Sequence, residues 1–491
     1  MRKFVSISSL AMGAALLAAA PGFAQPADPE NLLPPEPETV KEAQPDYTQM
    51  EARQPSRDTS RTTDQATRRE SVDRAFSDPQ FQTGEIVQKT AADWPQVLPW
   101  TVEQALALAG FIEGIGAEGL NPADYDPDSL RFAAEQGRSE VLDEIASKTF
   151  IWLIEDLRDG RTPMEGRKQW FVMDPDADRM PSGKLLKQAL ESDDVAGTLT
   201  SILPVHPDYA RLREELAKTP ETDSKRRKLI RANMDRWRWL PQELGKKYLI
   251  TNVPEYQLRL TVNDKIIKTY RTIVGKPGNT ATPQLGEMVE GVIFNPTWTV
   301  PQSIVKGEGL GAKVLANPGW AKAQGYKATK GEDGWVTVVQ QPGPTNSLGL
   351  MKLDMPNRHA IFLHDTPSRH LFKQANRALS HGCIRVEDAR TLAMTMAILG
   401  NMENKADIPV IQQEVQQITG SREYTAYPLK DNWPVYITYF TMAQDVNGEL
   451  KAFSDIYGRD AAVLAAFEAP RVANRSRVQG EEIIPIAAPG A

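Results

Sequence analysis

Apolar residues in the first half of the chain recur every three to four positions, which is the spacing of an amphipathic helix. One such run starts after Thr101, and a longer one starts after Ser139 and stops at Gly160. Thr and Ser are favoured helix N-caps, and Gly commonly ends a helix. Two shorter helical stretches follow before residue 220. The pattern predicts an all-helical domain over residues 91–221, with no chemical signature of its own.

After Pro241 the period of the apolar residues changes to two, which is the spacing of a half-buried strand. The segment 256–262 alternates in this way, Asn263-Asp264 is a turn signal, and 266–274 returns as a second strand. Further short strands are predicted at 289–294, 334–340, 360–364 and 435–440. Gly and Pro separate these strands, which favours a mainly antiparallel β domain within residues 222–465. The predicted fold class is therefore α+β multidomain, a helical domain followed by a β domain.

The stretch 301–333 differs from the strands around it. It is rich in Gly and Lys and only weakly periodic. We expect it to be an excursion from the β domain that acts as a lid.

A basic helix is predicted between Thr222 and Leu240, where the two domains join. It carries a cluster of Lys and Arg side chains and ends with Trp237 and Trp239. Such a helix could contact an anionic polymer. A solvated basic face, with the tryptophans packed into the next domain, is the favoured interpretation.

Residues 1–24 have the features of a secretory signal peptide. Arg2 and Lys3 precede an apolar stretch at 10–20, and Gly22-Phe23-Ala24 supplies the small residues of a cleavage site. Because this stretch is well short of the ~20 residues that span a bilayer, a cleaved signal is favoured over a permanent membrane anchor. Cleavage after Ala24 predicts export, and the bacterial periplasm is the compartment that fits.

The two ends of the remaining chain lack aliphatic clusters. Residues 25–90 are rich in Pro and charge, and residues 466–491 are rich in Pro and Ala. Such segments bury too little apolar surface to offset the entropy of ordering. We expect a disordered spacer and a disordered tail.

Composition excludes several classes of protein. The 491 residues are 41% hydrophobic and 25% charged, as in average soluble globular proteins. The net charge of −7 gives no general electrostatic reason to bind nucleic acid. The single cysteine, Cys383, excludes an intramolecular disulfide and any metal site that needs several cysteines.

Chemistry-bearing residues concentrate in one short window. Four of the five histidines lie between positions 359 and 381, and the segment Ser380-His381-Gly382-Cys383-Ile384-Arg385 follows. A thiol beside His and Arg, with a helix predicted soon after it, is in an environment that lowers a cysteine pKa. Gly382 lets the backbone approach a substrate closely, and the N–H groups of Gly382 and Cys383 could bind a developing oxyanion.

These residues favour covalent catalysis by Cys383, and two other interpretations compete with it. Cys383 could be an inert buried thiol, but the flanking His381 and Arg385 and an oxidising compartment argue against that. A metal site could be built from histidines 359, 364, 370 and 381 with Cys383. Neither a His-Glu-x-x-His helix nor a paired cysteine spacing accompanies these residues, so we expect no metal and no cofactor.

Ser-His-Gly-Cys-x-Arg, with His364 placed 19 positions before Cys383, resembles the catalytic domain of the YkuD-type L,D-transpeptidases. Other segments are similar to the large periplasmic, YcbB-like branch of that family. In the β domain and its approach these are 233–241, 274–276, 282–283, 294–298, 346–349 and 363–367; in the helical domain they are 119–122 and 156–161. The resemblance covers roughly residues 91–460.

The resemblance implies a role for each residue of the window. Cys383 would be the nucleophile, His364 the general base, and His381 a residue that orients or lines the site, while Arg385 and Ser380 would bind substrate. The implied substrate is a peptidoglycan tetrapeptide stem, whose third-residue carbonyl acylates the cysteine as D-alanine leaves. A diamino-acid side-chain amine of a neighbouring stem would then take the acyl group, which gives a 3→3 cross-link.

One departure from the branch and two alternatives complete the prediction. The branch often carries a peptidoglycan-binding module between its domains, whereas here helix 209–218 runs almost directly into helix 224–239. A hydrolase or exchange enzyme on the same thioester, such as a carboxypeptidase or an amidase releasing wall-bound protein, keeps every catalytic residue. A non-catalytic wall-binding scaffold is disfavoured by the intact Cys383 and His364. The acceptor stays open among stem peptide, D-amino acid and outer-membrane protein.

Overall fold

The computed structural model describes most of the chain downstream of the predicted signal peptide and spacer. The described residues are 85–88, 97–172, 176–263, 265–332, 334–471 and 476–479. The predicted signal peptide, most of the predicted spacer and most of the predicted tail lie outside them. No helix in these described ranges is long and apolar enough to cross a membrane.

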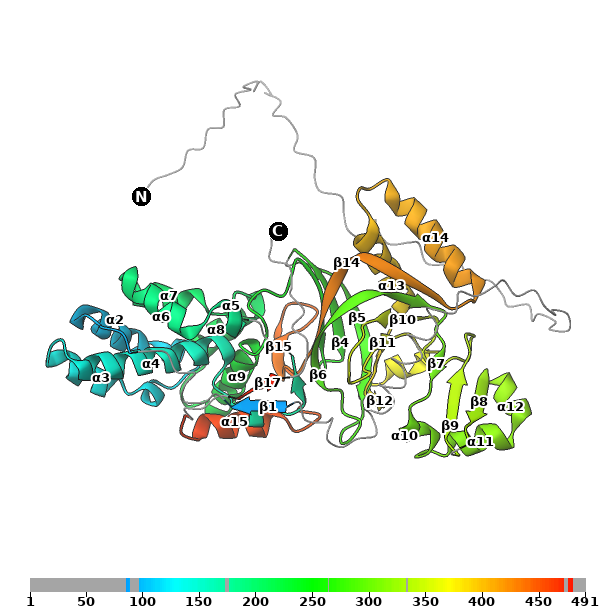
Figure 1. Cartoon of the computed structure of the whole chain (residues 1–491), viewed down its shortest axis with the longest axis horizontal. Coiled ribbons are helices and arrows are strands. Elements are labelled where there is room, and N and C mark those ends of the chain that lie inside the picture. The colour runs from blue at the N-terminus through cyan, green and yellow to red at the C-terminus, as the bar shows by residue number, and fades with distance from the viewer. Residues whose placement is uncertain are drawn as a thin grey trace, which may run out of the picture. The chain divides into compact units, whose positions relative to one another are not determined.

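The N-terminal domain is helical, as predicted (Figure 1). Its helices are α2 (Val102–Glu113), α3 (Pro127–Glu135), α4 (Glu140–Asp159), α5 (Asp176–Arg179), α6 (Ser182–Glu191), α7 (Val195–Ser201) and α8 (Pro207–Lys218), with 3₁₀ turns η4 (Ile115–Glu118), η5 (Pro122–Tyr125) and η6 (Met164–Gly166). Thr101 caps α2 through a reciprocal capping box with Gln104, and the Ser139 side chain caps α4 by accepting from the Leu142 N–H. The apolar stripes of α2, α3, α4, α6 and α7 meet in one hydrophobic core.

The second domain is built on a ten-stranded, mainly antiparallel sheet, which confirms the predicted class. Its strands are β2 (Trp170–Phe171), β3 (Lys247–Asn252), β4 (Gln257–Val262), β5 (Lys265–Gly275), β6 (Gln284–Phe294), β10 (Met351–Asp354), β11 (Leu363–His364), β12 (Ala378–Ser380), β13 (Ile384–Val386) and β14 (Thr425–Thr438). They follow the order β10-β11-β13-β5-β4-β3-β14-β6-β2, with β12 beside β5. Because β10 also pairs with β6, the sheet closes on itself as a barrel.

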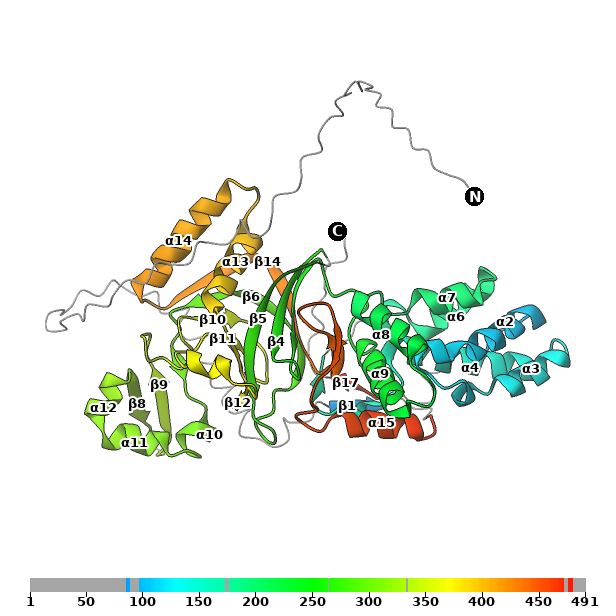
Figure 2. The same ribbon diagram turned by 180° about the vertical axis from the view of Figure 1, so that it is seen from behind.

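Two helices accompany the barrel, α13 (Ala389–Asn401) and α14 (Asp407–Ser421). Helix α13 packs against β14, β6 and β10, and α14 packs against α13 (Figures 1 and 2). The buried side chains of both helices join those of the strands in a single core. Strand β11 is shorter than the predicted strand 360–364, since Ala360 adopts a positive φ of 46° and breaks the extended run.

Residues 298–340 form a small lobe with its own sheet and core. The lobe contains α10 (Gln302–Val305), α11 (Leu310–Ala316) and α12 (Pro318–Ala323) around the sheet β7 (Trp298–Thr299), β9 (Val336–Gln340) and β8 (Tyr326–Lys330). Its core has only six buried side chains: Val300, Ile304, Val305, Val314, Ala321 and Val338. So small a core explains why the periodicity of 301–333 is weak.

Helix α9 (Ser224–Trp237) joins the two domains. Trp237 stacks between His206 and Phe440, and Trp239 packs edge-on against Trp170 at 5.4 Å. Both tryptophans are buried, as the favoured interpretation expected. Most of the basic side chains of α9 bind partners within the chain; Arg226, for example, pairs with Glu215 at 2.6 Å.

The remaining elements are C-terminal ones and the first strand of the described chain. They are the hairpin β15 (Met442–Gln444) and β16 (Leu450–Ala452), helix α15 (Asp460–Glu468), and strands β1 (Glu85–Gln88) and β17 (Ser476–Gln479), which pair with each other antiparallel. The expectation of disorder is therefore wrong for the eight residues of β1 and β17, and α15 continues past the expected domain end at 465. Local sequence could not reveal a strand whose partner lies at the opposite end of the chain.

Candidate active site

The turn between β12 and β13 holds Cys383. Its conformation depends on Gly382, whose φ of +116° lies in the region that side chains disfavour. A Cβ there would also come within 3.0 Å of Ile361 Cδ1. The buried Ser380 hydroxyl closes the turn: it accepts from the Gly382 N–H at 3.1 Å and donates to the Cys383 carbonyl at 2.5 Å.

Thr282, in the predicted Thr-Pro motif, supports this turn from outside. Its hydroxyl donates to the Gly382 carbonyl at 2.7 Å and accepts from the Gly275 N–H at 2.8 Å. The Tyr457 hydroxyl donates to the Gly275 carbonyl at 2.6 Å. The turn is thereby tied to the end of β5 and to the segment before α15.

Strand register places the reactive side chains on one face of the barrel wall. Lys352 of β10 is directly opposite His364 of β11, and His364 is directly opposite Arg385 of β13. Directly opposite residues project from the same face, and residues two apart on one strand do so as well. Cys383 lies in the turn directly before β13, two residues before Arg385, and the charges of Lys352 and Arg385 on this face both act on its thiol. The intervening Ile384 points into the core.

His364 is buried and fixed in one orientation. Its Nδ1 lies 2.5 Å from the Asp365 carbonyl. A carbonyl only accepts, so Nδ1 carries the proton and Nε2 is the candidate base. Burial, reinforced by the charge of Arg385, lowers the pKa of His364 to about 3. The ring also makes a backbone hydrogen bond with Leu348, which raises its pKa and partly offsets this lowering. The imidazole is neutral at physiological pH, as a general base requires.

The Asp365 carboxylate ties the end of β11, the strand that carries His364, to neighbouring segments. It accepts from the Leu350 N–H at 2.9 Å and pairs with Arg369 at 3.0 Å. Gly349 lies so close that a Cβ there would sit 2.4 Å from the Asp365 carboxylate. The predicted segments 346–349 and 363–367 therefore meet in space to position His364.

The environment of Cys383 differs from the expected one. Its half-buried thiol lies 3.6 Å from the Ala360 carbonyl. Burial raises the pKa of the Cys383 thiol, and the nearby charges of Lys352 and Arg385 only partly oppose this rise. Strand β13 separates Cys383 from the start of α13 in the chain. The predicted lowering of the Cys383 pKa is therefore wrong.

Arg385 is the mostly buried cation nearest the thiol in sequence. Burial lowers its pKa, and the interaction with Cys383 raises it. In the part of the chain that the structure describes, no carboxylate lies within ion-pair distance of Arg385. A guanidinium in that position is suited to an anionic group of a ligand.

The other predicted residues point in different directions. The His381 ring is largely exposed and contacts Glu308 of the small lobe, with Nε2 and Oε1 2.7 Å apart. The Gly382 N–H is engaged by Ser380, while the Cys383 N–H faces its own thiol. Ser380 shapes the turn with both of its hydrogen bonds, so a direct contact with substrate does not follow from its geometry.

The histidines considered for a metal site do not converge. His359 packs on the Phe171 ring at 4.2 Å, and His381 faces Glu308. Within the described ranges, no three His, Cys, Asp or Glu side chains gather in a way that could hold a metal ion.

Sequence reasoning missed three residues of this region. Lys352 is recognisable only once β10 is paired with β11, the Asp365 carbonyl acts through its backbone, and Glu308 lies far from Cys383 in the chain. Asp365 stands beside His364 in a quoted segment and could have been found. Glu308 leaves no local signal.

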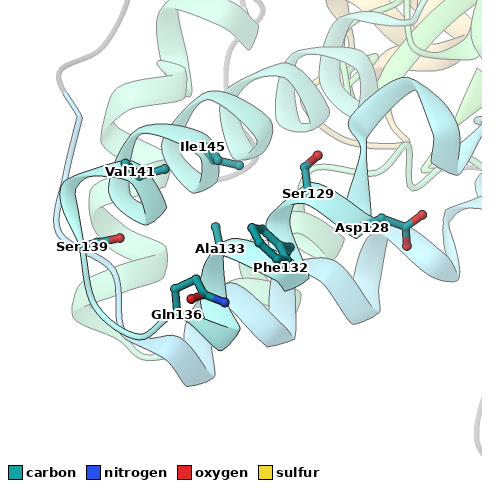
Figure 3. A pocket seen from close by; sticks show the side chains of 8 residues that line it. All are labelled: Asp128, Ser129, Phe132, Ala133, Gln136, Ser139, Val141 and Ile145. Atoms are coloured by element: carbon teal, nitrogen blue, oxygen red, sulfur yellow. The ribbon is translucent and has the colours of Figure 1, made fainter.

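A separate hollow lies on the helical domain, between α3 and α4. It has a volume of about 630 Å³ and is lined mainly by apolar side chains, including Phe132, Ala133, Val141 and Ile145 (Figure 3). None of its lining residues belongs to the barrel. Its lining contains neither a histidine nor a cysteine, and the catalytic candidates remain on the barrel face.

Comparisons with known proteins agree with this organisation. The family model of the YkuD L,D-transpeptidase catalytic domain matches residues 246–411, and that of a scaffold domain matches residues 98–216. A Haemophilus influenzae protein, whose name places it provisionally among the L,D-transpeptidases, is 30% identical over 231 residues. That match covers 44% of this chain and 45% of the relative, so it spans less than half of the relative's length.

Two solved structures are also similar over part of the chain. The Ldtfm–avibactam carbamoyl enzyme matches at 13% identity with a TM-score of 0.19, over 40% of this chain and 51% of that one. An L,D-transpeptidase from Mycobacterium smegmatis matches at 10% identity with a TM-score of 0.20, over 40% and 59%. Scores this low support no argument about the site.

Proposed function

The chain carries a YkuD-type L,D-transpeptidase catalytic domain behind a scaffold domain, and we propose that it is a peptidoglycan L,D-transpeptidase that uses Cys383 as its nucleophile. The observation that carries the proposal is the shared face of the barrel. There a buried, neutral imidazole lies directly opposite Arg385, a guanidinium without an ion-pair partner among the described residues, and the only thiol of the chain lies two residues before Arg385.

The acylation step follows from the two neutral groups. As the sulfur attacks the third-residue carbonyl of a tetrapeptide stem, the thiol proton passes to Nε2 of His364. A carbon–sulfur bond forms. The carbon–nitrogen bond then breaks, His364 returns the proton to the departing amine of D-alanine, and a thioester on Cys383 remains.

In the second step the protons move in the opposite direction, again through His364. The side-chain amine of a diamino acid on a neighbouring stem attacks the thioester and gives a proton to His364. The carbon–sulfur bond breaks, the thiol regains its proton, and a 3→3 cross-link is made. The thioester conserves the energy of the broken peptide bond, so the reaction calls for no cofactor.

Other groups of the region would serve this chemistry. Arg385 would bind a substrate carboxylate. The N–H groups of Cys383 and Gly382 are the candidates for the oxyanion site, with Gly382 exchanging its bond to Ser380 for one to the oxyanion. The lobe at 298–340 would act as a lid that excludes water, since its Glu308 contacts His381 next to the catalytic turn.

Product analysis tests this proposal. The purified chain is incubated with disaccharide-tetrapeptide, and the products are separated and weighed, with Cys383→Ala as the control. Dimers joined 3→3 and free D-alanine, both absent with the variant, are expected. Tripeptides without dimers would show that the protein is a hydrolase rather than a transpeptidase. Unchanged products with Cys383→Ala would refute covalent catalysis altogether.

The site of action is proposed from the sequence. We propose export to the periplasm with cleavage after Ala24, which the mass of the exported protein tests: it should begin at Gln25. The acceptor amine can be sought in the same way, by offering a stem peptide, a D-amino acid or an outer-membrane protein to the acyl-enzyme.

A further inference from the structure

Lys352 is a second cation on the face that holds Cys383 and His364. It lies on β10 directly opposite His364, on the side away from Arg385. Its side chain is half-buried. The imidazole is therefore flanked by a cation on each neighbouring strand.

The position of the ammonium group is fixed by an aromatic ring. Lys352 Nζ lies 3.9 Å from the centroid of the Phe362 ring, a cation–π contact. Phe362 is two residues before His364 and shares its face, and its carbonyl accepts from the Ile384 N–H at 2.9 Å, next to the nucleophile. The ammonium group thus stands over the part of the strand that faces Cys383. Its charge is felt by both His364 and Cys383, whose pKa values it lowers.

The chemistry of the leaving group brings a carboxylate to this position. His364 has to reach the departing amine in order to protonate it. When the leaving group is a single free amino acid, its α-carboxylate is attached to the same carbon as that amine. The carboxylate must therefore lie within a few bond lengths of the imidazole. Arg385 lies on β13, the strand that follows the thiol, and Lys352 lies on β10, at the other edge of β11.

We propose that Lys352 is a specificity-determining residue that binds the α-carboxylate of the leaving amino acid. This inference rests on the proposed acyl transfer and assigns a preference to it: acyl donors that end one residue beyond the scissile bond are selected. A donor with a longer or blocked end would place a neutral amide against the ammonium group. Lys352 and Arg385 would then bind different anionic groups of one substrate.

The test compares two donors that differ in one group. One is the tetrapeptide stem with a free terminal carboxylate, and the other is the same peptide with a terminal amide. The rate of acylation of Cys383 is followed by intact-protein mass spectrometry, which is unambiguous because the chain has one cysteine. A charge-assisted hydrogen bond predicts that the wild-type chain prefers the acid by roughly 10- to 100-fold in kcat/KM.

Lys352→Met keeps the length and apolar stem of the side chain and removes its charge. It is expected to slow acylation by the acid donor by that factor more than acylation by the amide donor, because only the acid loses a partner, whereas any change in the nucleophile or the base acts on both donors alike. Lys352→Arg should keep most of the preference. Lys405→Met, which removes an exposed lysine beyond the barrel face, is the charge-matched control and should change neither rate. Lys352→Gln repeats the test if the Met variant fails to fold.

The outcomes separate this inference from the function on which it rests. Equal losses on both donors would mean that Lys352 acts on the nucleophile or on the fold, and would overturn the inference while the transpeptidase stands. An unchanged acid preference in Lys352→Met would overturn it as well. No acylation of the wild-type chain by either donor would overturn the proposed function, and this inference with it.

Discussion

The free protein should hold Cys383 as a neutral thiol, and its alkylation should show this. Burial raises the pKa of Cys383 above its ordinary value of 9.0, while the pKa of His364 is lowered to about 3. Both shifts favour the pair of neutral groups, and only the mutual attraction of a thiolate and an imidazolium opposes them. The neutral thiol and neutral imidazole are therefore the populated forms in the free protein.

The assay is the rate of reaction with iodoacetamide between pH 5 and pH 10, read as the mass added to the intact chain. Only the thiolate reacts, so the rate should rise about tenfold per pH unit up to and beyond pH 8. A rate that reaches a plateau below about pH 7 would mean that a thiolate–imidazolium pair is already formed, and would refute the assignment of neutral groups.

His364→Gln is the companion variant, since it removes the imidazole without adding charge. If His364 is neutral, this variant leaves the pH profile of alkylation nearly unchanged. It should still slow acylation by a peptide donor by about 10²- to 10⁴-fold, because general-base catalysis is lost. In an ion pair, by contrast, the same change would move the alkylation midpoint upward by several units.

Three further predictions concern the support of the site. Asp235→Ala should lower the free energy of unfolding by about 3–5 kcal/mol in a urea titration, because this fully buried carboxylate accepts hydrogen bonds from three buried donors. The control Asp431→Ala, at an exposed ion pair, should lower it by less than about 1 kcal/mol. Similar losses of stability in the two variants would contradict this prediction. Gly382→Ala should slow acylation about tenfold or more, since the turn at φ +116° has to change, and a wild-type rate would show that the turn is not needed. Glu308→Ala should leave the unfolding temperature nearly unchanged but raise the share of hydrolysed over cross-linked product, as it frees the lobe from His381; an unchanged ratio would speak against a lid.

The parts of the fold that depend on local pattern could be predicted. Helix caps at Thr101 and Ser139 and the alternation along β4 and β5 are local properties, and the elements began close to where they were expected. Barrel closure could not be predicted, because it depends on the pairing of β10 with β6 across a long separation. Strands β11 and β13, with two and three residues, are too short to show a period.

The residues of the candidate site likewise include some that the sequence could predict and some that it could not. Cys383 and His364 could be proposed from the sequence because the Ser-His-Gly-Cys-x-Arg motif and the histidine 19 positions before its cysteine are recognisable together. The sign of the Cys383 pKa shift was missed, since the motif shows the neighbouring cations but not the burial that outweighs them. Lys352 appears in the sequence as one polar position of a short strand, and only the register across three strands gives it a place in the site.

The central claim is that Cys383 forms a thioester with a peptidoglycan stem. The most direct test mixes the purified chain with a tetrapeptide stem in the absence of an acceptor amine and weighs the intact protein. We expect a gain in mass equal to the tripeptide acyl group, located on Cys383 by fragmentation, together with release of one D-alanine and no gain in Cys383→Ala. D-Alanine release that survives in Cys383→Ala, or a wild-type chain that never carries the acyl group and releases no D-alanine, would contradict it.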